Sequence, residues 1–348
     1  MVSPLFNHLL IPFLLGIFLA INMGGSGTAP SFSAAYGANI IRKSLIPGFF
    51  GIMVFVGALI AGKATATTVG TELLPADMMG ISLVSIILFS VAISLLFANL
   101  IGIPQSTSQA TILAVTGPAC YFRVLNEHKL LFEIIPAWFI LPVTSFILCY
   151  LIGKYIYTPI RKRGYFTFTG ISKHPIIKIL IILMSAYVAF AIGANNVANA
   201  SGPIASMTIN ELNVKDEADN FILIMILATL VIAPSFGIGS SFFGHKLVRN
   251  TGKGIFLFGP VEAIIISFIT ASLLLLASVI KGIPSSLVQV NTTSIIGIGA
   301  ARLGFRNILR KTAVNKFFIV WLIAPCFSFT ISIVLTYLAD ITGILGLY

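Results

Sequence analysis

The chain has 348 residues, of which 57% are hydrophobic and only 9% are charged, and its mean hydropathy is +1.04. Soluble domains are about a quarter charged, so this composition excludes a soluble globular protein and indicates a polytopic membrane protein. The formal net charge of +11 does not indicate nucleic-acid binding, because Lys and Arg gather in the cytoplasmic loops of membrane proteins.

Hydrophobic passages of spanning length follow one another along the chain, and we expect all of them to be helical because no short alternating strands occur. In the first half they lie at about 4–41, 46–62, 78–102, 104–122 and 134–157. In the second half they lie at about 175–209, 221–241, 255–280, 284–300 and 317–343. Since no Lys or Arg precedes Arg42, we expect no cleavable signal peptide.

The first passage is too long for one simple spanning helix, which needs about 20 residues. Its middle, NMGGSGTAP at 22–30, is rich in Gly and ends in Pro, so we expect the helix to break there. The second half has a similar stretch, GANNVANASGP at 193–203, where a second break is expected. Unwound backbone at membrane depth is tolerated where it lines a cavity or is buried in protein.

Two polar segments are near copies of each other. The sequences GIPQSTSQAT at 102–111 and GIPSSLVQVN at 282–291 share Gly, Ile, Pro, one Ser and one Gln in register, and Gly117 recurs as Gly297. Interrupted segments at matching places in two apolar halves are the best sequence indication of a transporter's substrate site. We expect Pro104 and Pro284 in the first turns of two half-helices, where a missing N–H costs nothing.

The charges of the loops predict how the halves are threaded through the membrane. The segment 158–174 carries four Lys or Arg and no acid, so it is expected in the cytoplasm, as is the loop at Arg42 and Lys43. The acidic loop 210–220, which corresponds to the Arg42 loop, is expected outside. The mixed loop 123–133 corresponds to the basic loop 301–316.

These opposite charges predict an all-α protein made of two inverted-topology repeats, with broken helices and two helical hairpins at the midplane. The predicted organisation is a first repeat at 1–157, a cytoplasmic basic linker at 158–174 and a second repeat at 175–348. Each repeat crosses the membrane an odd number of times. Both termini of this multi-pass cell-membrane protein are therefore expected outside.

The four interrupted segments carry hydroxyl and amide side chains and no Lys or Arg. Helix N-termini and neutral donors suit a small oxyanion that must also leave again. Isolated Ser and Thr more often bond to their own helix, but a repeated polar set is costly in lipid and favours function. The predicted substrate-binding residues are Ser26, Thr28, Ser106, Thr107, Ser108, Gln109, Asn195, Asn196, Asn199, Ser285, Ser286, Gln289 and Asn291.

The segment GANNVANA at 193–200 resembles the signature GANDVANA of the inorganic phosphate transporter (PiT) family. Both copies of the signature and both polar segments occur in family order, so the resemblance covers nearly the whole chain. It implies an inverted-repeat fold with two helical hairpins, anion transport coupled to Na⁺ or H⁺, and a homodimer in the lipid bilayer.

The chain departs from this signature at its acidic position. Asn196 replaces the second-half Asp, and Gly27 stands at the matching place in the first half. The pattern is similar to the CysP-type sulfate permease branch of the family. Sulfate carries no proton and offers only acceptors, so a carboxylate beside it would be repulsive, whereas protonated phosphate benefits from an acceptor. The loss of both acids therefore favours sulfate, with phosphate as the alternative.

The coupling ion is expected to be H⁺ rather than Na⁺, because a Na⁺ site prefers charged oxygen ligands. The candidate coupling residues are Glu262, a carboxylate within a hydrophobic passage, and Asn196. The alternative for Glu262 is a helix-end side chain capped by backbone. No metal site or cofactor is predicted, and Cys120, Cys149 and Cys326 are interpreted as packing residues.

A cation-coupled permease with alternating access explains the duplicated polar segments. An anion channel fits the paired hairpins less well. A membrane enzyme is not predicted, because no His or Cys lies in the polar segments to form a nucleophile–base pair or a metal cluster.

Overall fold

The computed structural model describes residues 4–37, 40–102, 105–162, 174–214, 218–244 and 259–345, and every element in these ranges is a helix. The principal elements of the first half are α1 (Pro4–Gly37), α2 (Ile46–Ala61), α3 (Lys63–Thr67), η2 (Thr68–Glu72), α4 (Ile81–Ile101), α5 (Thr107–Tyr121), η4 (Lys129–Ile134), α6 (Ile135–Leu151), η5 (Ile152–Tyr157) and α7 (Thr158–Lys162). Those of the second half are α9 (Pro175–Ile192), η6 (Gly193–Val197), α10 (Ala198–Glu211), α11 (Ala218–Ile232), α12 (Pro234–Gly239), η7 (Ser240–Gly244), α14 (Pro260–Leu275), η8 (Leu276–Ile280), α15 (Leu287–Leu303), α16 (Phe305–Leu309) and α17 (Thr312–Ile341).

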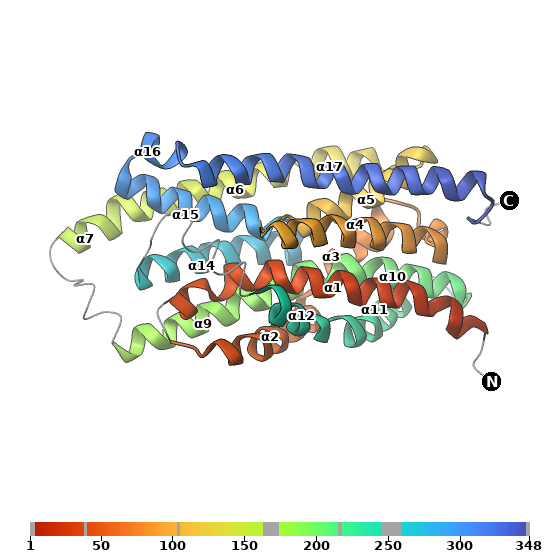
Figure 1. Cartoon of the computed structure of the whole chain (residues 1–348), viewed down its shortest axis with the longest axis horizontal. Helices are drawn as coiled ribbons and strands as arrows, with labels where there is room; N and C mark the ends of the chain where they lie inside the picture. The colour runs from red at the N-terminus through yellow and green to blue at the C-terminus, as the bar shows by residue number, and fades with distance from the viewer. Residues whose placement is uncertain are drawn as a thin grey trace.

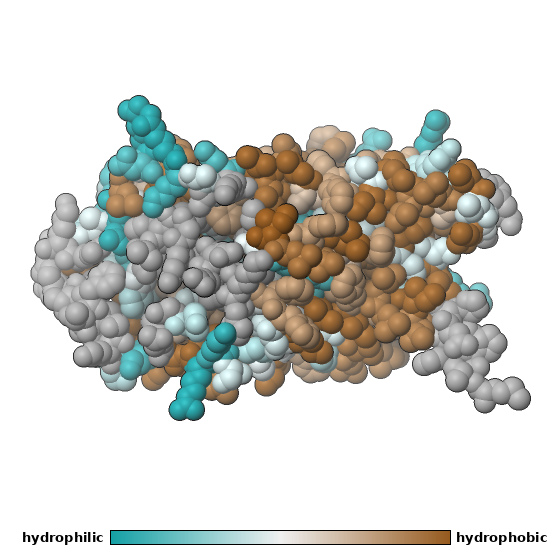
Figure 2. Space-filling view, viewed as in Figure 1, coloured by the Kyte–Doolittle hydropathy of each residue, from teal (hydrophilic) through white to brown (hydrophobic). Residues whose placement is uncertain are grey.

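The helices lie side by side along the long axis of the molecule, with both chain termini at one end and α7 and α16 at the other (Figure 1). Within the described residues, eight helical stretches are long and apolar enough to cross a membrane. Figure 2 shows a broad hydrophobic band over the middle of one face, with hydrophilic side chains near α7 and α16. These features confirm the prediction of a polytopic helical membrane protein. The middle of the 158–174 segment lies outside the described residues.

The break expected in the first passage is absent, so this prediction was wrong: α1 continues through residues 22–30 as one helix with Pro30 inside it. Hydroxyl side chains bond to carbonyls one turn earlier along this stretch. Ser26 donates to the Met23 carbonyl at 3.0 Å, Thr28 to Gly24 at 2.7 Å and Ser31 to Gly27 at 3.0 Å. Such bonds, together with packing by neighbouring helices, re-satisfy a membrane helix that contains Gly and Pro.

The break expected at 193–203 is replaced by a wider turn. Residues Gly193–Val197 form a single π-helical segment, η6, between α9 and α10, and Pro203 lies inside α10. The chain therefore stays helical from Pro175 to Glu211. A π turn inside a long helix often marks a functional site, because it re-aims side chains without unwinding the backbone.

The two repeated segments begin short helices that each pack on one long neighbour: α5 packs chiefly on α17, and α15 on α6. Ser328 of α17 donates to the Ala110 carbonyl at 3.0 Å, and Ser145 of α6 donates to the Val290 carbonyl at 3.1 Å. The accepting carbonyls occupy equivalent positions of the repeated segments. The same chemistry therefore holds both short helices.

The paired glycines of the repeated segments lie where these helices approach most closely. A Cβ added at Gly117 would meet the Ile333 backbone nitrogen of α17 at 3.0 Å, and one at Gly297 would meet the Phe146 carbonyl of α6 at 2.5 Å. Small residues permit such close approach between membrane helices. This packing explains why Gly recurs at both positions.

Candidate functional site

The short helices α5 and α15 begin in the same way. The hydroxyl oxygens of Ser106 and Ser286 cap the two helices and accept from the backbone N–H of Gln109 and of Gln289, each at 3.3 Å. A serine cap satisfies one of the orphan N–H groups of a helix's first turn. Pro284 precedes the cap by two residues, so its predicted place in the first turn was wrong; Pro104 lies outside the described residues.

A small cavity lies between the starts of α5 and α15 on one side and α1 and η6 on the other. Its lining combines hydroxyl and amide groups with two apolar side chains and comprises Ser26, Gly27, Ser106, Thr107, Asn196, Leu287 and Val288. The volume open to the centre of a water molecule is about 10 Å³, which is about the space that one water needs. The N-terminal ends of α5 and α15 both border it, so their dipoles favour an anion there.

The carboxamides of Gln109 and Gln289 bond to each other across the interface between α5 and α15. Gln109 Nε2 donates to Gln289 Oε1 at 3.0 Å, and Gln289 Nε2 donates to Gln109 Oε1 at 2.9 Å. Both side chains are buried. This reciprocal contact, called the glutamine pair below, lies in the first turn of each of the two helices whose first residues line the cavity.

The side chain of Asn195, on η6, ties together three parts of the site. Its Nδ2 donates to Ser108 Oγ at 3.0 Å, Asn196 Oδ1 at 2.7 Å and the Ser285 carbonyl at 2.8 Å. Its Oδ1 accepts from Ser278 Oγ and from the Ser285 backbone N–H, both at 3.0 Å. Asn195 thus uses all of its polar groups within the protein, and in this state it positions the site instead of facing the cavity.

Other predicted residues lie at different distances from the cavity. Asn199 donates to Ser108 Oγ at 3.4 Å, and its Oδ1 is buried without a hydrogen-bond partner among the described residues. The Thr28 hydroxyl donates to a carbonyl of its own helix, α1, and the side chain packs against Gly244. Asn291 is buried on α15 and does not line the cavity. The structure therefore gathers most of the predicted polar residues into one region, but only four of them line the cavity: Ser26, Ser106, Thr107 and Asn196.

Sequence reasoning missed three residues of this region. Leu287 and Val288 line the cavity, and Ser278 holds Asn195 in place. The first two lie inside the repeated segment and could have been found from their position there. Ser278 lies in an apolar run without any distinguishing signal.

The two positions at which the family signature carries an acid differ in the space around them. Asn196 borders the cavity, so a carboxylate of the same size fits there. A Cβ added at Gly27 would approach Phe50 Cζ at 3.1 Å and Ile192 Cδ1 at 3.3 Å, and both of these side chains are fully buried. An acid at position 27 would therefore require apolar neighbours to move.

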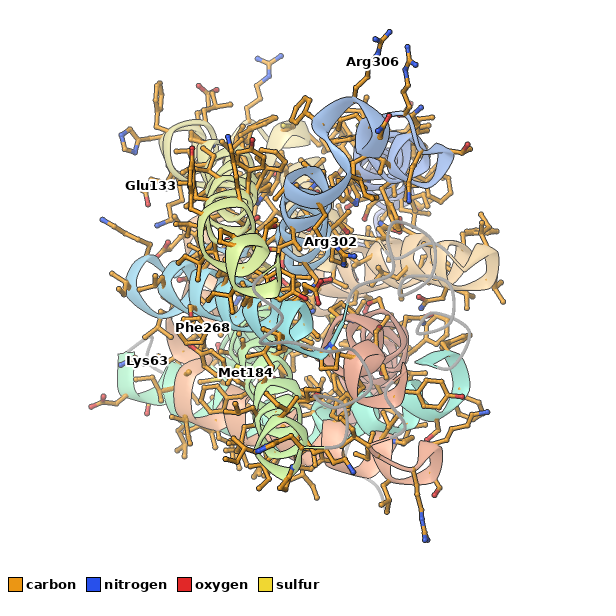
Figure 3. The ribbon with its side chains drawn as sticks, turned by 90° about the vertical axis from the view of Figure 1, so that its left-hand side faces the viewer. Lys63, Glu133, Met184, Phe268, Arg302 and Arg306 are labelled. Atoms are coloured by element: carbon orange, nitrogen blue, oxygen red, sulfur yellow. The ribbon has the colours of Figure 1, made fainter. Side chains whose placement is uncertain are left out.

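Glu262 does not lie at the cavity. It is the third residue of α14, where one carboxylate oxygen accepts from the Gly259 backbone N–H at 2.7 Å and the other pairs with Arg302 Nη1 at 2.7 Å. Arg302, seen from the α7 end of the molecule in Figure 3, is 13 residues after Gln289 on α15. At a rise of ~1.5 Å per residue, this separation is about 20 Å.

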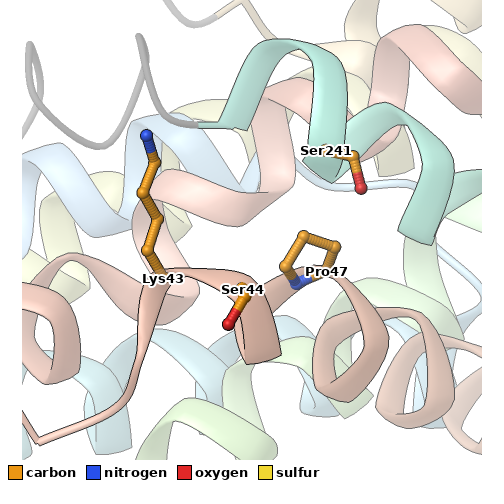
Figure 4. Close-up of a pocket in the computed structure, with 4 residues that line it drawn as sticks. All are labelled: Lys43, Ser44, Pro47 and Ser241. Atoms are coloured by element: carbon orange, nitrogen blue, oxygen red, sulfur yellow. The ribbon is translucent and has the colours of Figure 1, made fainter.

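A second, wider pocket of about 470 Å³ lies between the start of α2 and η7 and is lined by Lys43, Ser44, Pro47 and Ser241. Figure 4 shows Ser241 across the opening from Pro47. None of its lining residues belongs to the predicted substrate set.

Comparison with known proteins places the chain among anion transporters. A model of the phosphate transporter family matches residues 23–332. The sulfate permease CysP of Bacillus subtilis (strain 168) is 32% identical over 324 residues, covering 92% of this chain and 85% of the relative. A second protein of that organism, named "Probable low-affinity inorganic phosphate transporter", is 25% identical over 312 residues, with 87% of both chains covered.

A solved structure titled "The sodium-dependent phosphate transporter" has a TM-score of 0.80 to this chain at 21% identity, covering 96% of this chain and 99% of that one. It shows that the fold is that of a known transporter. The relatives are named permeases or transporters, which confirms a transport protein rather than an enzyme. The family match spans most of the sequence, and the chain belongs to the phosphate transporter family.

Proposed function

We propose that the protein is a permease for a small, fully ionised inorganic oxyanion, and that this anion is sulfate. The observation that carries the proposal is the lining of the cavity, whose polar residues are Ser26, Ser106, Thr107 and Asn196, without a carboxylate among them. Hydroxyl and amide N–H groups can donate to every oxygen of sulfate, which has no proton to give. The relative named a sulfate permease supports the same substrate.

Phosphate is the second candidate, because another relative is named a phosphate transporter. Phosphate keeps at least one proton near pH 7 and is recognised best where an acceptor meets that proton. The Asn196 Oδ1 already accepts from Asn195 at 2.7 Å. Without a carboxylate, the lining can meet the proton of phosphate only with neutral oxygens, which accept more weakly than a charged one, so it suits sulfate better.

The transport cycle that we propose uses two inverted repeats, 1–157 and 175–348, joined by the linker 158–174. The equivalent serine bonds to Ala110 and Val290 and the equivalent caps at Ser106 and Ser286 support this internal symmetry. The pairs α4–α5 and α14–α15 are then hairpins that meet at the substrate, and rocking of one repeat against the other alternates access.

In the cell membrane, both termini would lie outside and the linker inside, since both termini lie at the end of the molecule opposite α7. We propose a homodimer from the family resemblance alone. For coupling we propose H⁺ with Glu262 as the proton site. Among the described residues, Glu262 is the one acidic side chain that is buried. Its pairing with Arg302 means that a proton would have to replace the guanidinium.

The experiment that tests the proposal is uptake of isotope-labelled sulfate and phosphate into proteoliposomes under imposed H⁺ or Na⁺ gradients. We expect sulfate uptake driven by an inward H⁺ gradient. Phosphate uptake with no sulfate uptake would overturn the substrate, and dependence on Na⁺ alone would overturn the coupling ion.

A further inference from the structure

We infer that the glutamine pair and a bound oxyanion exclude each other, so that an oxyanion binds only when Gln109 and Gln289 separate. This inference rests on the proposed function, since it concerns how the same site opens for its anion. It gives the two residues a role beyond that of substrate ligands, because their carboxamides also bind each other.

Within the pair, both carboxamide oxygens have a hydrogen-bond partner. Each carboxamide has one oxygen and two N–H groups, and each oxygen accepts one N–H of the partner, at 3.0 and 2.9 Å. The pair buries two amides in a region where an unmet hydrogen bond costs ~1–3 kcal/mol. The contact therefore satisfies two buried oxygens that would otherwise lack a partner.

The cavity beside the pair is too small for an oxyanion. The adjoining cavity has room for about one water, which is less than a tetrahedral anion of five heavy atoms needs. Its walls include the first residues of α5 and α15, and the glutamine pair joins these helices within the same first turn. Widening the cavity by moving either helix start lengthens both hydrogen bonds of the pair.

The partial charges of the two paired carboxamides do not suit an anion. An oxyanion requires N–H groups, yet the two carboxamides place their oxygens between the helix starts as well. The second N–H of each carboxamide makes no hydrogen bond to any residue that the structure describes. Once the pair separates, both N–H groups of each amide can turn to the anion and both oxygens can turn away. Anion binding and the pair are thus alternatives.

The chain offers an unusually clean test, because Gln105, Gln109 and Gln289 are its only glutamines. We would label wild-type protein with ¹³C,¹⁵N-glutamine, reconstitute it into liposomes and record solid-state NMR spectra without anion, with saturating sulfate and with saturating phosphate. Gln105 serves as the internal control, since its Nε2 donates to Ser94 Oγ at 2.8 Å and not to either glutamine of the pair. A Gln105→Asn sample assigns its signals.

We expect a through-space cross-peak between the Nε2 of one paired glutamine and the Cδ of the other in anion-free protein. Saturating sulfate should remove this cross-peak while the Gln105 signals stay in place. A missing cross-peak in anion-free protein overturns the inference, and so does a cross-peak that persists while labelled sulfate is bound to the same sample. If sulfate does not bind, the proposed substrate fails instead, and loss or persistence of the cross-peak with bound phosphate decides the role of the pair. Binding of neither anion overturns both.

Discussion

The indole N–H of Trp138, on α6, donates to the Pro284 carbonyl at 3.0 Å. This bond fixes the segment between η8 and α15, which also carries Ser285 and the cap Ser286. The other tryptophan of the chain, Trp321, lies on α17 and packs against a cluster that includes Ile295 and Ile298 of α15, and its buried indole N–H has no hydrogen-bond partner among the described residues. Of the two half-buried tryptophans, only Trp138 therefore holds a polar segment among the described residues.

Trp138→Phe is expected to destabilise the protein by ~0.5–1.5 kcal/mol more than Trp321→Phe, because only the first change removes a hydrogen bond. The measurement is the thermal midpoint of each variant in detergent, with sulfate uptake recorded in parallel. Both changes remove similar aromatic surface, so Trp321→Phe serves as the control. Equal shifts of the midpoint would show that the bond to Pro284 contributes nothing.

Gln109→Leu and Gln289→Leu are each expected to leave one buried carboxamide without its partner, at ~1–3 kcal/mol. Because the two residues form one contact, the Gln109→Leu/Gln289→Leu double variant should lose little more stability than either single variant. Sulfate affinity should fall by roughly ten- to a hundred-fold in the single variants. Additive losses of stability would contradict the paired geometry, and unchanged sulfate affinity in all three variants would remove the glutamines from the site.

Asn196→Asp is expected to reduce sulfate uptake at least about ten-fold, because it sets a carboxylate against a divalent anion in a dry site. The carboxylate can still accept from Asn195 Nδ2, so the local geometry should survive. Asn196→Ser is the control, since it shortens the side chain without adding charge. Wild-type sulfate uptake by Asn196→Asp would end our reason for preferring sulfate over phosphate.

Glu262→Gln is expected to abolish uptake driven by the pH gradient while exchange of sulfate across the membrane continues, because an amide cannot carry the proton. The change also leaves the Arg302 guanidinium without its carboxylate, which destabilises the end of α15. The Glu262→Gln/Arg302→Gln double variant removes this second effect. Recovery of pH-driven uptake in the double variant would show that Glu262 is structural and that the coupling site lies elsewhere.

The proposed sidedness predicts that two exposed positions label from opposite sides. In a background with Cys120 and Cys326 replaced by Ala, Asn213→Cys should react with a membrane-impermeant maleimide in intact cells. Arg306→Cys, at the α7 end of the molecule in Figure 3, should react only after permeabilisation. Labelling of both from one side would refute the proposed sidedness of the second half.

Several features were readable from the sequence because they depend on local chemistry. Hydropathy predicted the helical passages, and the register between 102–111 and 282–291 pointed to helix starts that the structure caps with Ser106 and Ser286. The recurrence of Gly117 as Gly297 corresponds to a close approach of α5 to α17 and of α15 to α6. The family resemblance carried by GANNVANA was confirmed by the match over 23–332.

The predictions of helix breaks were wrong because helix propensity is a local average, which tertiary packing can override. Gly and Pro weaken residues 22–30, but back-bonding hydroxyls and close neighbours keep α1 continuous. A close neighbour is visible at Gly24, where an added Cβ would clash with the Phe236 carbonyl oxygen. The same glycines that suggest a break in isolation permit this contact.

The sequence by itself determined a helical membrane transporter of this family, with its polar residues confined to a few repeated segments, since hydropathy, caps and motifs are written in neighbouring residues. Only the tertiary structure decided how those residues divide their roles. It brings the carboxamides of Gln109 and Gln289 into contact although 180 residues separate them. It directs the Asn195 amide to Ser108 and Ser285. It also places Glu262 in an ion pair with Arg302 and not at the cavity. Each of these pairings depends on which helices pack together, and no local pattern specifies the distance between residues so far apart in the chain.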